Sequence, residues 1–310
     1  MLCMNQEIDS AASAMYTNNR ENQLFKGRII GKDLLAKLLE MVSPEFKGLP
    51  KEEIYACMDL EDDGTTVAGT SIMSPFPFNG PILFDSAYRI RLPKTGEPGP
   101  IVGIVVQGRK TLDPRMKWKV MQYYSRLIVD QRKDYSTDEE LFENLRKSIL
   151  IWIRLSQKPD FRNCMYRSSW YKYDRAHPEK KEYCPDWSES FELNVGTYDE
   201  VPETPELGAL SILFSSELDN AEKTKELREK YDIVVNGGIL KEARAMIAVA
   251  TEMNKIREER DEELVRLYTD EILKKAEESD RSEEDILSEL TVLPEHRNFI
   301  REHLKKCQNS

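Results

Sequence analysis

The stretch ILFDSAYRIRLPKTGEPGPIVGIVVQ, residues 82–107, decides the fold. It holds two apolar runs, 82–92 and 101–107, which the residues PKTGEPG separate. A cluster of glycine and proline favours a chain reversal, so the pattern predicts a β-hairpin. The second run begins IVGIVV, a β-branched sequence without polar alternation, which is typical of a strand buried on both faces.

Outward from the hairpin, helical and extended patterns alternate. Leucines and a valine between residues 34 and 42 share one helical face, and a short helix is expected over 51–60. Asp113 and Pro114 open an amphipathic helix over 115–132, and SILIWIRL (148–155) predicts a third strand. Further strands are expected near 164–173 and 191–195, and helices over 207–214 and 221–231. The order of elements indicates an α/β domain.

The chain is expected to divide into three regions. The polar residues 1–27 predict a mobile leader, residues 28–200 hold the α/β pattern, and Pro202 and Pro205 mark a boundary. Residues 201–310 form a strongly charged helical region. Its helices could bind a protein partner or another copy of the chain.

Composition narrows the class of protein. The chain has 310 residues, of which 40% are hydrophobic and 33% are charged, with a net charge of −11. No apolar run is long enough to span a membrane and no signal segment is visible, so we expect a cytoplasmic protein without a membrane partner. The acidic balance argues against a simple nucleic-acid coat protein. The five cysteines and three histidines match no zinc-site spacing.

A basic cluster lies directly after the hairpin. Residues 109–133 contain eight basic side chains against Asp113 and Asp130. Such a patch in an acidic protein could contact a phosphate backbone, although a solvated amphipathic helix would have the same composition. The candidate contacts to nucleic acid are Arg109, Lys110, Arg115, Lys117, Lys119 and Arg126.

Asp85 is an acidic residue within an otherwise apolar strand. A carboxylate buried there without a partner would be costly. It must therefore face water, meet a cation or bind a metal ion.

These stretches together resemble the PD-(D/E)XK nuclease family transposases, relatives of the recombination-promoting nucleases. The resemblance rests on FDSAYRIRLP, IVGIVVQ, YYSRLI and LIWI in this order, and on the upstream stretch IIGKDLLAKLLEMVSPEFKGLPKEEI. It implies a restriction-endonuclease-like fold, in which a mixed sheet is flanked by helices. It also implies Mg²⁺-dependent hydrolysis of DNA phosphodiesters, in which carboxylates hold the metal against the scissile phosphate.

Residue by residue, the resemblance makes Asp85 the first metal ligand and Gln107 the glutamine of the family's Glu-x-Gln strand. Glu45 matches an acidic position in the first helical segment. The position of the metal-binding glutamate is Val105, which offers no oxygen. The resemblance therefore implies a nuclease relative with impaired or lost hydrolysis, which needs Mg²⁺ only if it is active. The alternative is a non-catalytic DNA- or protein-binding module on the same fold.

Overall fold

The computed structural model describes residues 30–69, 86–108, 116–155, 161–169, 171–173, 181–183, 188–279, 282–289 and 294–308. The expected leader, 1–27, lies outside the described residues. The chain forms two compact units, and the boundary between them falls between Ala250 and Thr251.

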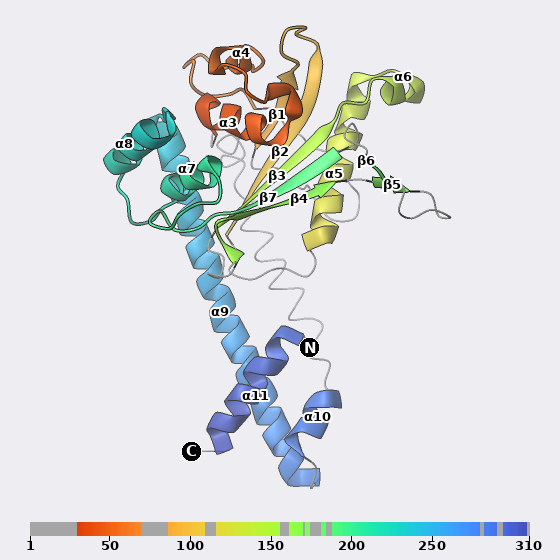
Figure 1. The fold of residues 1–310 in the computed structure, drawn as a ribbon. Helices are drawn as coiled ribbons and strands as arrows, with labels where there is room; N and C mark the ends of the chain where they lie inside the picture. Colours follow the sequence, from red (N-terminus) through yellow and green to blue (C-terminus); the bar gives the residue numbers. More distant parts are fainter. Residues whose placement is uncertain are drawn as a thin grey trace. The chain divides into compact units, whose positions relative to one another are not determined.

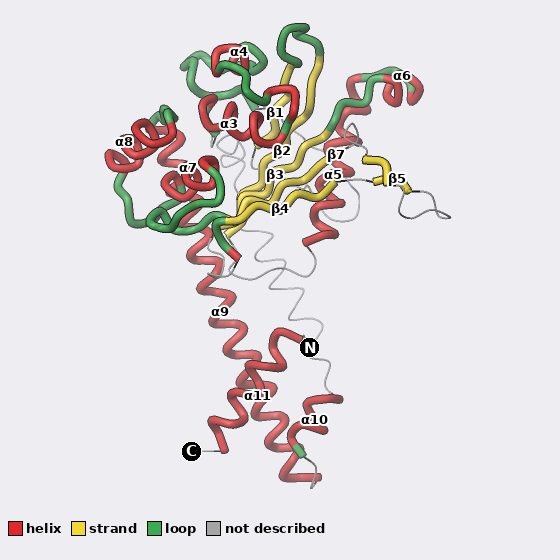
Figure 2. The backbone as a smooth tube through the Cα atoms, viewed as in Figure 1, coloured by secondary structure: helices red, strands yellow, loops and turns green. Residues whose placement is uncertain are grey.

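The first unit is built on a five-stranded mixed sheet, whose strand order is β1-β2-β3-β7-β4 (Figures 1 and 2). The central strands β2, β3 and β7 are parallel, and the edge strands β1 and β4 are antiparallel to their neighbours. The predicted hairpin is confirmed as the β1–β2 pair. The strand bounds are β1 Ser86–Arg91, β2 Pro98–Gly108, β3 Ser148–Leu155, β4 Cys164–Ser169 and β7 Ser188–Asn194.

The apolar runs of the sequence form the centre of this sheet. All eight residues of β3 are buried, and so are residues 101–105 of β2. A parallel pair needs a long crossover connection, which here contains helix α5 (Met116–Gln131). The continuous apolar runs were expected for strands covered on both faces, and helices do flank the sheet on both faces (Figure 1).

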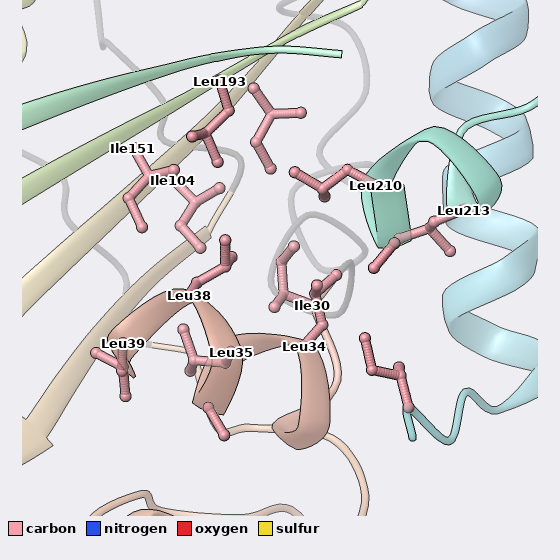
Figure 3. Close-up of a cluster of buried hydrophobic side chains, with 14 of the residues drawn as sticks. Ile30, Leu34, Leu35, Leu38, Leu39, Ile104, Ile151, Leu193, Leu210 and Leu213 are labelled. Carbon is pink, nitrogen blue, oxygen red and sulfur yellow. The ribbon is translucent and has the colours of Figure 1, made fainter. Parts of the chain in front are cut away.

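One face of the sheet carries the main hydrophobic core. Helices α3 (Lys32–Val42) and α7 (Pro205–Leu213) direct leucine side chains toward Ile104, Ile151 and Leu193 of the sheet (Figure 3). These side chains are almost fully buried. Close packing of large aliphatic groups makes this core the principal source of hydrophobic stabilisation.

The amino-terminal turn of α3 is tied to distant parts of the first unit through Asp33. This buried carboxylate accepts hydrogen bonds from the Tyr55 hydroxyl at 2.6 Å and the Val234 backbone N–H at 2.7 Å. Burial and the neighbouring Asp33 raise the pKa of Tyr55. Nearby, the Asn236 side chain donates to the hydroxyl of Thr65 at 3.0 Å. These bonds fasten the segment before α9 (Gly237–Ser279) to the α3 region.

The opposite face of the sheet is covered by α5. Val120, Tyr124 and Leu127 of this helix form a separate cluster with side chains of β1, β2 and β3. The cluster members on the strands are Ala87, Ile101, Val105, Leu150 and Trp152.

The remaining elements of the first unit are short helices, a small hairpin and α8. A Thr137–Glu140 capping box begins α6, and an Asp219–Glu222 capping box begins α8. In each helix, these side chains accept hydrogen bonds from backbone N–H groups that the first turn leaves unpaired. The bounds are η2 Pro44–Phe46, α4 Lys51–Tyr55, η3 Arg132–Asp134, α6 Asp138–Glu143, β5 Tyr171–Tyr173, β6 Lys181–Tyr183 and α8 Asn220–Tyr231.

The second unit is helical. It holds the later part of α9 (Gly237–Ser279) together with α10 (Glu283–Glu289) and α11 (Pro294–Gln308). Its own small core contains Ile272, Ile286, Leu287, Ile300 and Leu304. Among the described residues, no helix is long and apolar enough to cross a membrane.

The boundary between the units differs in position from the one expected at residue 200. Helices α7 and α8 belong to the first unit, because Leu207, Leu213 and Leu227 are part of the main core. The prolines at 202 and 205 mark the start of α7 instead, where Pro205 occupies the first turn.

Candidate functional site

The structure separates two residues that the resemblance places in one site. Gln107 lies near the end of β2 and shares its strand face with Val105, on the side covered by α5. Glu45 is exposed on η2, and its carboxylate accepts a hydrogen bond from Ser43. Because α3 and Phe46 of η2 pack on the opposite face of the sheet, Glu45 and Gln107 are not brought together.

The other sequence candidates are only partly within the described structure. Asp85, Arg109, Lys110 and Arg115 lie outside the described residues. The backbone of Lys117 and Lys119 belongs to α5, but their side chains are not described.

Arg126 is described, and its position differs from that of a surface contact. Its side chain is 2% exposed, and burial lowers the pKa of the guanidinium. The side chain therefore points into the protein from α5, whereas a group that binds a phosphate backbone at the surface must be accessible.

Val105 occupies an apolar environment. It is 5% exposed and packs with Trp152, its register partner on β3, in the cluster beneath α5. An aliphatic side chain there provides no ligand for Mg²⁺, which takes oxygen donors. Within the described ranges, no group of three or more His, Cys, Asp or Glu side chains is placed to hold a metal ion.

A row of polar residues crosses the sheet one step beyond Val105. In register, Gln107 pairs with Arg154, Arg154 with Asn194, and Asn194 with Cys164. Paired residues of a sheet share a face, so all four lie on the side covered by α5. Gln107, Arg154 and Asn194 stand at the carboxyl ends of three parallel strands, which is where open α/β sheets bind ligands. We call these four residues the polar row.

Arg154 is the charged centre of the polar row. Its side chain is fully buried, and its Nη1 lies 3.2 Å from Oε2 of Glu192, whose side chain is 19% exposed. Glu192 pairs in register with Trp152, so it lies one row closer to the middle of the sheet. A buried cation is costly without a partner, and this carboxylate supplies the compensating charge.

Several other polar side chains of this face, including Ser190, are incompletely satisfied. Among the described residues, Oε1 of Gln107, Oδ1 of Asn194 and Nε1 of Trp152 are buried and have no hydrogen-bond partner. Buried polar atoms in native proteins are almost always paired, so such a group needs an explanation. Two of these atoms are acceptors and one is a donor, and they gather on one face around a buried guanidinium, which makes this end of the sheet the candidate site in the described structure.

The outer end of the polar row reaches the surface. Asn194 Nδ2 donates to Cys164 Sγ at 3.6 Å, and the hydrogen bond of Tyr166 with Cys164 raises the pKa of the Tyr166 phenol. Tyr166 is 50% exposed. A solvent-facing border beside buried polar groups is a common arrangement in ligand sites.

Sequence reasoning named Gln107 as a candidate and did not name Arg154, Glu192 or Asn194. Arg154 gives one local signal, because it is the only charged residue in the run SILIWIRL. Glu192 and Asn194 give no local signal in the sequence, because the pairing of β7 with β3 is what places them beside Trp152 and Arg154.

Comparisons with known proteins do not identify the chain. No protein-family model, curated protein or solved structure matches it.

Proposed function

We propose that this protein is a relative of the PD-(D/E)XK nuclease family transposases that binds DNA and has lost phosphodiester hydrolysis. The sequence resemblance suggests the family, and the order of elements is compatible with it. A helix, an antiparallel hairpin, a crossover helix and a parallel strand follow one another as α3, β1–β2, α5 and β3. A restriction-endonuclease-like fold is part of this proposal.

The observation that carries the loss of hydrolysis is the environment of Val105. The side chain that stands at the metal-binding glutamate position is packed among Trp152, Tyr124 and Leu127. Mg²⁺ in a nuclease stabilises the charge that develops on the phosphate and activates water. Losing a carboxylate that holds it removes much of this stabilisation, which lowers rates by orders of magnitude.

Binding to DNA is supported by the basic residues of 109–133. Basic side chains release counterions when they neutralise phosphates, so the affinity for DNA should fall steeply with salt. Arginine also suits phosphate oxygens, because its planar guanidinium presents several donors in a fixed arrangement.

The test compares the wild type with Asp85→Ala, Val105→Glu and the double variant, on plasmid DNA in Mg²⁺ and in Mn²⁺. We expect the wild type to bind DNA in a salt-dependent manner and to leave the plasmid intact. Nicking by Val105→Glu that disappears in the double variant would support a site that has lost its carboxylate. Robust cleavage by the wild type, unaffected by Asp85→Ala, would refute the proposal.

A second candidate is a protein-binding scaffold. It is favoured by Leu267 and Phe299 of the second unit, which are each 57% exposed. Exposed large apolar side chains are common at protein interfaces. This function predicts no salt-dependent affinity for DNA.

A further inference from the structure

We propose that the loop between α5 and β3 is a docking surface for a protein partner, with Phe142 as its anchor. The partner offers an apolar pocket bordered by lysine or arginine side chains. We call residues 132–145, which include η3 and α6, the α6 loop. It lies at the margin of the first unit (Figure 1). This inference does not rest on DNA binding, and it concerns a different surface from Leu267 and Phe299 of the second unit.

The α6 loop is closed at its base. The buried Gln131 donates a hydrogen bond from its amide Nε2 to the backbone carbonyl of Arg146 at 3.1 Å. Its Oε1 accepts a hydrogen bond from the backbone N–H of Arg146 at 2.9 Å. The two ends of the loop are therefore held together just before β3 begins. Compact surface loops whose ends lie close together are frequently functional.

The interior of the loop is also ordered. The Tyr135 hydroxyl donates to the backbone carbonyl of Asn144 at 2.9 Å, and the capping box at the start of α6 holds the first turn of the helix. Leu141 is 8% exposed, so it is the apolar side chain that α6 turns toward the protein. A surface that is ordered before it binds loses less conformational entropy when a partner binds.

Phe142, the next residue, is directed to solvent. Its side chain is 74% exposed, and that of Leu145, at the end of the loop, is 37% exposed. An aromatic side chain gains the free energy of hydrophobic burial only where other groups cover it. On an ordered loop, Phe142 is therefore a preformed apolar anchor that another molecule can cover.

The charges around Phe142 indicate the chemistry of the partner. Glu139 lies three residues before Phe142 and four before Glu143, so the three side chains share one face of α6. Both carboxylates are exposed, and neither has an ion-pair partner in the described part of the chain.

The basic side chains in and beside the loop each have a partner within the protein. They are Arg132 with Asp138, Lys133 with Asp130, Arg146 with the backbone carbonyls of Ile90 and Gly99, and Lys147 with Glu189. These basic groups therefore leave the charge of Glu139 and Glu143 uncompensated. A pocket bordered by lysine or arginine complements this charge, whereas an acidic partner such as DNA is repelled.

Two variants test the anchor and the charge separately. Phe142→Ser removes the apolar group, and the double variant Glu139→Lys, Glu143→Lys reverses the charge beside it. Because all three side chains are exposed, we expect both proteins to keep the melting temperature of the wild type. An unchanged melting temperature shows that any loss of binding does not come from unfolding.

Matched controls come from the second unit. Phe299→Ser replaces another exposed phenylalanine, whose side chain is 57% exposed. The double variant Glu262→Lys, Glu263→Lys changes the net charge of the protein by the same amount at two exposed glutamates of α9. These variants measure what a loss of exposed aromatic area or of negative charge does at a surface outside the α6 loop.

The experiment uses a phage-displayed library of a small helical scaffold protein, in which one surface is randomised, and selects binders to the full chain. The affinity of each independent binder is then measured for the wild type and the four variants. We expect most binders to lose about 10-fold or more in affinity for Phe142→Ser and to keep their affinity for Phe299→Ser. Their randomised positions should be enriched in lysine and arginine, and Glu139→Lys, Glu143→Lys should weaken them most at low salt.

The remaining outcomes overturn the inference. Binders that tolerate Phe142→Ser, or that lose the same affinity for Phe299→Ser, would show that Phe142 is not an anchor. Binders without an excess of basic residues would show that the stated chemistry of the partner is wrong, and a selection without binders would show that the loop does not dock proteins. The affinity for DNA should be the same in Phe142→Ser and in the wild type, so a failure of DNA binding affects only the proposed function.

Discussion

The two faces of the central sheet use the same strands in different ways. The face toward α3 and α7 is lined by aliphatic side chains such as Ile104, Ile151 and Leu193. The face toward α5 is mixed, because Ser190 and Glu192 of β7 stand in register with Leu150 and Trp152 before the row of Gln107, Arg154 and Asn194 begins. Natural proteins concentrate such departures from an apolar interior at functional sites, so the difference makes the aliphatic face the main source of stability and the polar end of the other face the candidate site.

The largest effect should come from the aliphatic face. Leu38→Ala creates a cavity at a fully buried position of α3, and we expect it to lower the free energy of unfolding by about 2–5 kcal/mol. Urea denaturation monitored by circular dichroism measures this change. The exposed Leu267 provides the control, since Leu267→Ala should change stability by less than about 0.5 kcal/mol. Similar losses in both variants would contradict this assignment of the core.

The next effect concerns the bonds that fasten α3. Tyr55→Phe removes the hydroxyl that donates to the buried Asp33, and we expect a loss of about 1–3 kcal/mol. The same denaturation experiment measures it, with Tyr198→Phe as an exposed control. A loss no larger than that of the control would mean that water replaces the tyrosine at Asp33.

On the face toward α5, replacing a polar side chain by an apolar one should not lower the free energy of unfolding. Gln107→Leu removes a half-buried amide whose buried Oε1 has no described partner, so we expect unchanged stability or a gain of up to about 1 kcal/mol. The matched control is Gln131, a buried glutamine that bonds the backbone N–H and carbonyl of Arg146. Gln131→Leu should destabilise by about 1–3 kcal/mol. Destabilisation by Gln107→Leu to the same extent would assign Gln107 to the fold instead of a site.

The smallest effect is a pH dependence in the loop that Asn236 contacts. Hydrogen bonds from Thr66 and Thr65 lower the pKa of Asp63 from 3.8 to about 2. The ionised carboxylate therefore contributes stability above pH 3.8, and this contribution is lost as the pH falls toward 2. Asp63→Asn should be less stable than the wild type at neutral pH, and the two melting temperatures should converge below pH 3.8. A constant difference at all pH values would show that the charge is not responsible.

Local patterns could predict much of the sheet. SILIWIRL has the bounds of β3, and IVGIVV is buried as its composition indicated. The amphipathic helix expected over 115–132 is α5, within one residue at each end. These elements are predictable because their periodicity and turn residues are encoded in neighbouring positions.

The candidate site could be predicted only in part. Gln107 lies on the strand in which the resemblance predicts site residues. Its neighbours in the polar row lie on other strands, and the sequence does not indicate how those strands pair with one another. Strand β7 lies between β3 and β4, although β4 precedes it in the chain. The register that brings Asn194 beside Arg154 is therefore a product of tertiary pairing, which single-sequence patterns do not contain.

The position of β7 also has a consequence for how the chain acquires its structure during synthesis. Among the described strands, β4 hydrogen-bonds with β7 alone. Residues 164–169 therefore leave the ribosome before the strand with which they pair has been synthesised. Until residues 188–194 are synthesised, one backbone edge of β3 has no strand to pair with. Arg154 therefore lacks its neighbours on β7 at this stage. The polar row is thus one of the last parts of the sheet to be completed, because a chain that ends before residue 188 lacks Asn194.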